Sequence, residues 1–481
     1  MNRVPGAYTL QAHNLHEIAV DARRLLFHVP SSALFESDQL TGDLLAELRT
    51  RNSASLADLQ SALLPRHDGE AVADAVAELL DLEILRGDAT IAARPRPMRP
   101  TRFPLTTVVL NVNTGCNLSC TYCYKEDLAV PAKGRKMSLA TARQAVEMLL
   151  RESPDQLRYN IVFFGGEPLT NLPLIRAVVD WAEPHFAALG KHVDFSLTTN
   201  ATLLDETVID FLQAHRFGIA VSIDGPKAVH DRNRVTVGGR GTYDVVARKV
   251  RLLLDRYHAR PVGARVTLTR GTTDVVGIWD HLFNELGFAE VGFAPVTAGD
   301  VASFNLTEEE LVAVFGSLRV LGGLYLEAAL ENRNIGFSNL HQLLTDIHQG
   351  TKKALPCGAG YSMVAVDYAG DVHLCHRFTG SKLPTFGSVG QGLERDALGD
   401  LLDARLDREG TGCATCRIRN LCSGGCYHES YQRYGDPTHP SYHYCELMRE
   451  WIDYGIAAYA RILTANPAFF VDHLAPRRAT S

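Results

Sequence analysis

Ten cysteines dominate the chemistry that this sequence can do. Three of them, Cys116, Cys120 and Cys123, fall within eight residues of the stretch NTGCNLSCTYCYKED. The other seven lie between positions 357 and 445. The N-terminus has no apolar core of signal-peptide length, so we expect a reducing compartment. Cysteines clustered in such a chain favour metal binding or catalysis over a disulfide framework.

The first three cysteines suit an iron–sulfur cluster. The spacing Cys116-x3-Cys120-x2-Cys123 can hold three corners of a [4Fe–4S] cubane, for which thiolates are the usual ligands. The fourth iron then has no protein ligand, and an open metal position is how a catalytic site admits a small molecule. The alternative is a structural zinc site with a distant fourth ligand.

The surrounding sequence indicates a parallel α/β fold. From Thr106 onward, short apolar strands alternate with amphipathic helices, which predicts parallel strands with both faces covered. Sites in such folds lie at the C-terminal ends of the strands, and the three cysteines directly follow the first strand. The predicted strands are 107–113, 159–168, 192–201, 218–226, 262–270 and 291–296, and the predicted helices are 139–152, 172–186, 207–216, 243–257 and 275–286.

The segment CNLSCTYC resembles the signature of radical S-adenosylmethionine (SAM) enzymes, including the aromatic Tyr122 before the last cysteine. In that family SAM binds the open iron, and its reductive cleavage gives a 5′-deoxyadenosyl radical that abstracts a hydrogen atom. The resemblance covers roughly residues 105–300 and implies an α/β fold, a partial (β/α)6 barrel.

Three further motifs follow in the order that this resemblance implies. FFGGEP matches the motif whose backbone and Glu167 contact the SAM amino group, and SLTTNATLL matches a SAM-contacting strand with Ala201 in place of the usual glycine. SIDGP and Arg234 match positions near the ribose and carboxylate. Each motif alone could be a simple turn. The implied SAM-binding residues are Tyr122, Gly165, Gly166, Glu167, Pro168, Thr198, Asn200, Ser222 and Arg234.

The seven C-terminal cysteines resemble a SPASM domain, which carries two auxiliary [4Fe–4S] clusters in peptide-modifying radical SAM enzymes. The resemblance implies three [4Fe–4S] clusters in all. It assigns Cys357, Cys375 and Cys426 to the first auxiliary cluster, and Cys413, Cys416, Cys422 and Cys445 to the second. A zinc ribbon is the alternative for Cys413, Cys416, Cys422 and Cys426, but it leaves three thiols without a use.

One cysteine of the SPASM pattern is missing. The segment HQGTKKALPC has no cysteine before Cys357, so the first auxiliary cluster keeps an open iron or takes another ligand such as His348. An open iron could bind a substrate cysteine and present its sulfur to a carbon radical. His376, directly after Cys375, is the candidate catalytic residue for moving a proton, or a structural histidine beside the cluster. Tyr124, Lys125, Glu126 and Asp127 either line the substrate entrance or form a solvated turn.

The chain divides into several expected segments. The segments LTGDLLAELRT, SLADLQSALL and GEAVADAVAELLDLEIL read as helices. LQSALL, the helix after it and EILRGD resemble a winged helix-turn-helix, which is either a peptide-recognition module or a structural cap. The expected order is an N-terminal peptide-recognition domain at 1–93, a proline-rich linker at 94–104, the radical SAM barrel at 105–300, a helical connection at 301–350, the SPASM domain at 351–450 and a C-terminal helix and tail at 451–481.

The sequence resembles most the radical SAM/SPASM proteins that mature quinohemoprotein amine dehydrogenases. CNLSCTYCYKEDL, FHVPSSALFESD and LCHRFTG carry this likeness. It implies intrapeptide thioethers between cysteine sulfur and the methylenes of Asp or Glu in the small subunit of the dehydrogenase. It also implies SAM as cofactor, a peptide substrate that adds a strand to a sheet edge, and an electron donor such as flavodoxin or ferredoxin.

Other functions remain open. The enzyme could make sactipeptide or carbon–carbon links, activate an anaerobic sulfatase by forming formylglycine, or be a non-enzymatic iron–sulfur or zinc scaffold that binds peptides. The net charge of −7 does not indicate a nucleic-acid partner. The sequence has no apolar run of 18 residues, the length that predicts a membrane span. We therefore expect a cytoplasmic protein.

Overall fold

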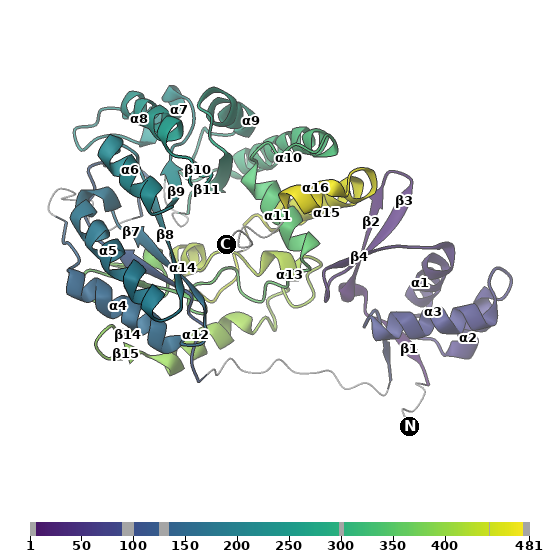
Figure 1. Cartoon of the computed structure of the whole chain (residues 1–481). Coiled ribbons are helices and arrows are strands. Elements are labelled where there is room, and N and C mark those ends of the chain that lie inside the picture. Colours follow the sequence, from purple (N-terminus) through teal and green to yellow (C-terminus); the bar gives the residue numbers. More distant parts are fainter. Residues whose placement is uncertain (1–5, 89–100, 125–133, 298–302, 442, 475–481) are drawn as a thin grey trace.

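The computed structural model describes residues 6–88, 101–124, 134–297, 303–441 and 443–474. Its centre is a sheet in which six parallel strands follow one another in chain order (Figure 1). The predicted alternation of strands and helices is therefore confirmed. These strands are β6 (Thr107–Asn111), β7 (Arg158–Phe164), β8 (His192–Thr199), β9 (Gly218–Ser222), β10 (Val262–Leu268) and β11 (Glu290–Pro295).

Helices cover one face of this sheet (Figure 1). Side chains cap several of their N-termini: Ser138, Asp205 and Asp274 each accept a hydrogen bond from a backbone N–H of the first turn. The predicted helix 275–286 continues past residue 280 as a π-helical turn, His281–Glu285. These helices are α4 (Leu139–Glu152), α5 (Leu172–Ala188), α6 (Glu206–Ala214), α7 (Lys227–Asn233), α8 (Tyr243–Arg256) and α9 (Val275–Asp280).

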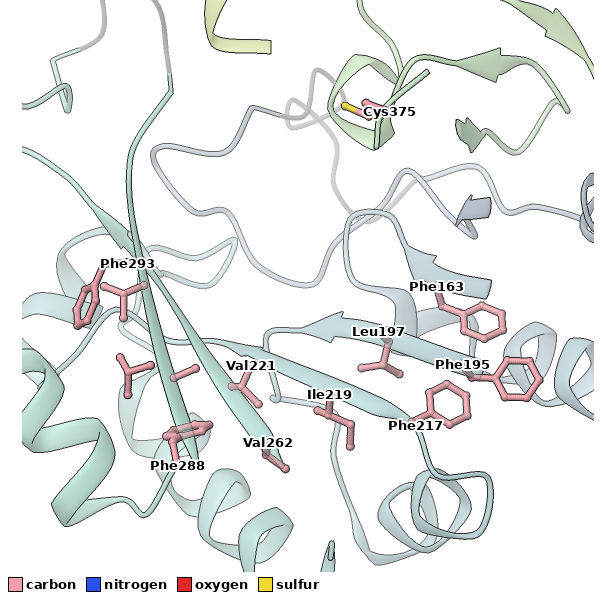
Figure 2. Packing of buried hydrophobic residues seen from close by; sticks show 14 of the residues in the cluster. Phe163, Phe195, Leu197, Phe217, Ile219, Val221, Val262, Phe288, Phe293 and Cys375 are labelled. Atoms are coloured by element: carbon pink, nitrogen blue, oxygen red, sulfur yellow. The ribbon is translucent and has the colours of Figure 1, made fainter. Parts of the chain in front are cut away.

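The two faces of the sheet differ in burial. Phe163, Phe195 and Phe217 stack under the helices with ring centroids 5.5–6.2 Å apart (Figure 2). Burial alternates along β7, however, and Phe164 on the opposite face is only half-buried. Phe164 packs there against His376 of the C-terminal region, with ring centroids 4.2 Å apart, so the second face of β7 borders the interior of the partial barrel and is partly covered.

The cysteine-rich C-terminal region extends the same sheet. Strand β12 (Met363–Val366) pairs in parallel with β6, and β13 (Val372–His373) pairs antiparallel with β12. The chain leaves β13 into Cys375, so this pairing fixes where that cysteine lies. The region also contains β14 (Gly387–Ser388), β15 (Gly392–Leu393), α12 (Arg395–Leu406), α13 (Arg419–Cys422) and α14 (Tyr427–Tyr434).

Long helices join these parts, as expected for residues 307–350 and the C-terminal end. Helix α10 (Glu308–Leu330) is long and apolar enough to pass a test for a membrane span, but it packs against α9 and α15 (Cys445–Ala465). Its buried residues recur every three or four positions, so one face of the helix packs against these neighbours. Helices α11 (Ser338–His348) and α16 (Ala468–His473) complete this layer.

Across residues 6–88, the N-terminal region has the three predicted helices and five strands. Its elements are β1 (Tyr8–Leu10), β2 (Leu15–Val20), β3 (Arg23–His28), β4 (Ala33–Glu36), α1 (Gln39–Arg51), α2 (Leu56–Leu63), α3 (Gly69–Asp81) and β5 (Leu85–Gly87). The strands β2, β3 and β4 form an antiparallel sheet, and β2 lies against α15, where His16 Nε2 is 2.8 Å from Asp453 Oδ1. The predicted linker lies outside the described residues from 94 to 100.

Candidate active site

The loop with Cys116, Cys120 and Cys123 is held from two sides. Towards β7, the backbone N–H of Gly166 donates to the carbonyl of Asn113 at 3.2 Å, and that of Glu167 donates to Gly115 at 3.1 Å. On the other side, the N–H groups of Ser119 and Thr121 donate to the carbonyls of Val235 and Asn233 at 2.8 and 3.0 Å. The thiols therefore lie between the end of β7 and the segment that follows α7.

The glycines of FFGGEP are required by this close approach. Gly165 has a φ of +145°, and a Cβ there would meet the Asn113 carbonyl oxygen at 2.4 Å. A Cβ on Gly166 would lie 2.1 Å from the carbonyl oxygen of Gly115, directly before Cys116. The motif lets two backbones touch at the cysteine loop.

We expect Gly166→Ala to displace the cysteine loop, because backbone atoms and not a flexible side chain occupy the space. SAM affinity should fall about tenfold or more, since overpacking costs about 1–3 kcal/mol. Equilibrium binding of SAM to the reconstituted protein measures this. Gly316→Ala is the matched control, because nothing lies within 4 Å of its added Cβ on α10. Equal SAM affinity in both variants would contradict this account.

Glu167 ties β7 to the end of β8. Its carboxylate accepts hydrogen bonds from the Leu169 N–H at 3.1 Å, the Thr199 hydroxyl at 2.8 Å and the Asn200 N–H at 2.7 Å. Burial raises its pKa to about 7, and these three hydrogen bonds oppose the rise. Pro168 is buried beside it. The carboxylate thus holds the TTN segment in place, and the contact of Glu167 and its neighbouring backbone with SAM stays a prediction.

The TTN segment reaches the cysteine loop through amides. Asn200 Nδ2 donates to Asn117 Oδ1 at 2.9 Å and lies 3.8 Å from Cys116 Sγ. Thr198, half-buried at the end of β8, lies on the strand face opposite to Thr199. Ala201 adopts a φ of +62°, a left-handed conformation that explains why a glycine is usual at this position of the motif.

A buried ion pair supports the other side of the loop. Arg234 Nε is 2.9 Å from Asp224 Oδ2, and their side chains are 9% and 2% exposed. The Tyr122 hydroxyl donates to the same carboxylate at 2.7 Å, and the guanidinium lies 5.4 Å from the Tyr122 ring centroid. Ser222 ends β9, two residues before Asp224. Asp224 thus fixes both Tyr122 and Arg234 beside Cys120.

The residues present fit a cubane cluster with bound SAM. All three thiols are free, and burial raises the pKa of Cys116 to about 12 and that of Cys120 to about 11. The Arg234 charge opposes the rise at Cys120. The Asn113 Oδ1 atom is buried next to Gly165 without a hydrogen-bond donor among the described residues. This acceptor suits an ammonium group such as the amino group of SAM.

A second group of thiols lies across Tyr124 from the first. Cys375 is close enough to both Cys357 and Cys426 for their charges to interact. Tyr124, which is half-buried, interacts in the same way with Cys123 and Cys375, and the Arg377 guanidinium lies 4.9 Å from its ring centroid. The structure thus brings together the three cysteines expected for the first auxiliary cluster and places them beside the SAM-cluster loop.

His376 faces the barrel. Its ring centroid is 4.2 Å from that of Phe164, the last residue of β7, on the half-buried face of the sheet. The imidazole is itself half-buried, so it can contact a substrate in the barrel interior. A role in proton transfer remains a prediction.

The third group of thiols lines a cavity of about 490 Å³. Its walls include Arg408, Tyr444 and Arg449, together with the four cysteines expected for the second auxiliary cluster, Cys413, Cys416, Cys422 and Cys445. No three His, Cys, Asp or Glu side chains of the described residues converge on one metal-ion position. Four thiols around a cavity suit a multi-iron cluster, whose irons each take a different thiolate.

Several expectations turn out differently or stay outside the structure. His348 stacks on Phe470 at 4.9 Å and contacts the Tyr459 hydroxyl at 3.2 Å, so its ring packs on the C-terminal helices and not on the cysteines. Lys125, Glu126 and Asp127 lie outside the described residues. Asp224 was not among the residues predicted for the site, although the SIDGP motif contains it. The signal in the sequence was an aspartate in a glycine–proline turn at the end of a predicted strand, where site residues of parallel sheets lie.

Comparisons with known proteins agree with this geometry. Residues 110–275 match the model of the Radical SAM superfamily. The chain is 24% identical over 373 residues to the cysteine-type anaerobic sulfatase-maturating enzyme of Clostridium perfringens (strain 13 / Type A), covering 73% of this chain and 96% of that enzyme. It is 24% identical over 357 residues to the serine-type enzyme of Klebsiella aerogenes, covering 70% of this chain and 82% of that enzyme.

Solved structures show the same fold. The structure described as native anSMEcpe with bound AdoMet superposes with a TM-score of 0.65 at 21% identity, covering 75% of this chain and 100% of that one. A second structure of that protein, with AdoMet and the Cp18Cys peptide, gives a TM-score of 0.64 at 22% identity, covering 76% and 99%. The predicted radical SAM α/β fold is therefore confirmed.

Proposed function

We propose that this chain, whose residues 110–275 form a radical SAM domain, is a maturase that modifies a peptide between the SAM-cluster loop and the first auxiliary cysteine group. The observation that carries the proposal is the position of Tyr124, which interacts with both Cys123 and Cys375. A substrate that enters between these two groups of cysteines contacts Phe164 and His376 on the half-buried face of β7. The peptide held by a structural neighbour supports this class of substrate.

The chemistry divides between cofactors and protein. When bound, SAM and its cluster supply a 5′-deoxyadenosyl radical after one-electron reduction, and the auxiliary clusters supply an acceptor for the electron released as a carbon–sulfur bond forms. Glu167 and Asp224 orient the two sides of the SAM site. His376 takes the proton of the substrate thiol, since an imidazole titrates near neutral pH.

The specific reaction that we propose is thioether formation between a cysteine sulfur and an Asp or Glu methylene, in the small subunit of a quinohemoprotein amine dehydrogenase. Cys375 interacts electrostatically with both Cys357 and Cys426, which supports a first auxiliary cluster with three protein thiolates and one further position. A substrate cysteine can complete this set. The exposure of Cys357 supports access from solvent.

The N-terminal region offers a surface for the substrate's leader segment. Its sheet has the order β2-β3-β4, and among the described elements β4 pairs only with β3. The residues of β4 are half-buried or exposed, whereas β2 lies against α15. An extended peptide can therefore add to β4 as a further strand.

A second candidate function is formylglycine formation in a sulfatase. The alignments to cysteine-type and serine-type anaerobic sulfatase-maturating enzymes, which cover 73% and 70% of this chain, favour it. In either case we expect a cytoplasmic protein. We also expect a flavodoxin or ferredoxin as electron donor, because SAM cleavage needs a low-potential reductant.

Mass spectrometry of product peptides tests the proposal. We expect the reconstituted protein, given SAM and dithionite, to remove two hydrogens from a dehydrogenase small subunit and to protect one cysteine from alkylation for each link. A sulfatase peptide treated in parallel should remain unchanged. Formylglycine in the sulfatase peptide, with no change in the dehydrogenase subunit, would replace the first function by the second.

A further inference from the structure

Arg405 is a buried cation at the junction of the two auxiliary cysteine groups. It lies on α12 and is 3% exposed. Its guanidinium donates to the carbonyl oxygens of five residues, and none of these acceptors is a carboxylate. They are Ser423 at 3.4 Å, Gly424 at 2.8 Å, Gly425 at 2.7 Å, Thr438 at 2.9 Å and His439 at 2.7 Å.

The first three acceptors form a turn between cysteines of different groups. Cys422 belongs to the cavity group, which consists of Cys413, Cys416, Cys422 and Cys445. Cys426 belongs to the group with Cys357 and Cys375, next to His376. The three residues between them all have left-handed backbones, with φ values of +57°, +80° and +84°. This conformation turns three successive carbonyls toward the guanidinium. The Gly424 N–H donates a hydrogen bond to the Cys422 thiol. Burial raises the pKa of Cys422, and this hydrogen bond opposes the rise.

The same guanidinium lies within electrostatic reach of cysteines in both groups. It interacts electrostatically with Cys413 and Cys426, and with Cys357. The Tyr427 ring, with its centroid 5.2 Å from Cζ, covers one side. Buried charges interact strongly because little solvent screens them. Arginine keeps its proton in such a place, so the charge is permanent.

We propose that Arg405 is a positioning residue for both auxiliary clusters. It fixes the Cys422–Cys426 turn through the carbonyl groups of that turn, and it supplies a buried positive charge that raises the reduction potentials of both clusters. This inference rests on the proposed function in one respect, namely that both cysteine groups bind iron–sulfur clusters. Reduction adds negative charge to a cluster, so a fixed cation beside it favours the reduced form.

The test compares Arg405→Gln and Arg405→Lys in the full-length, anaerobically reconstituted protein. Iron is counted per chain, and each cluster is titrated by electron paramagnetic resonance. We expect Arg405→Gln to move both auxiliary potentials to more negative values, while the potential of the SAM cluster stays unchanged. If Arg405→Gln instead loses about eight irons of about twelve, and Arg405→Lys regains them, the proposal also stands.

Other outcomes overturn it. Wild-type iron content and potentials in both variants would show that Arg405 has no such role, and loss of all three clusters together would indicate general misfolding. Arg395→Gln is the control on the same helix, because its guanidinium binds the Glu152 carboxylate at 2.7 Å. An equal shift in this control would also overturn the proposal. Only about four irons in the unmutated protein would refute the proposed function itself.

Discussion

Replacing Cys120 by alanine should abolish SAM cleavage. Cys120 is the middle thiol of the loop, and backbone hydrogen bonds from Ser119 and Thr121 fix its neighbours on both sides. The loop therefore cannot move another thiol into its place. With two thiolates left for a cubane, we expect iron to fall by about four per chain and 5′-deoxyadenosine to fall to background.

Cys413→Ala is the matched control for this experiment. It removes a thiol from the cavity group, away from the SAM-cluster loop. It should also lose about four irons but keep SAM cleavage. Chromatography of 5′-deoxyadenosine after reduction with dithionite separates the two variants. Continued cleavage in Cys120→Ala would contradict the assignment of this loop.

Replacing Asp224 by asparagine should destabilise the fold strongly. The change leaves the Arg234 guanidinium buried without a counter-charge, and removing one partner of a buried ion pair costs about 3–5 kcal/mol. The Tyr122 hydroxyl and the Thr267 N–H also lose a charged acceptor. We therefore expect a clear fall in the thermal unfolding midpoint, together with weaker SAM binding.

Asp244→Asn provides the comparison for this prediction. Asp244 pairs with Lys227 on the surface, where their side chains are 71% and 58% exposed. Exposed pairs contribute about 0–1 kcal/mol, so this variant should melt close to the unmutated protein. Both variants remove one negative charge. A difference between their melting temperatures therefore reports the burial of Asp224 and not the change in net charge. Similar melting of the two would mean that Asp224 does not neutralise Arg234.

The sequence predicted the elements of the barrel because their patterns are local. An apolar strand such as TVVLN and an amphipathic helix such as 139–152 carry their own periodicity. The cysteine motifs are local in the same sense. The pairing of β12 with β6 was not predicted, because it joins residues more than 250 positions apart and depends on no turn signal.

The supporting contacts of the site were also beyond prediction. Asp224 and Tyr122 are 102 positions apart, and Arg405 reaches its carbonyl partners across 18 to 34 positions. Nothing in the spacing of these residues indicates that they meet. The same holds for Glu167. Its motif predicted a position at the SAM site, but the motif did not reveal that the Thr199 hydroxyl and the Asn200 N–H donate hydrogen bonds to its carboxylate.

Metal content together with SAM cleavage decides whether this chain is a radical SAM enzyme. The full-length protein is reconstituted anaerobically, its iron and zinc are counted, and dithionite and SAM are added. A radical SAM enzyme with three clusters should contain about twelve irons per chain and release 5′-deoxyadenosine. Zinc in place of iron, or SAM left intact, would contradict the account and indicate a structural metal protein.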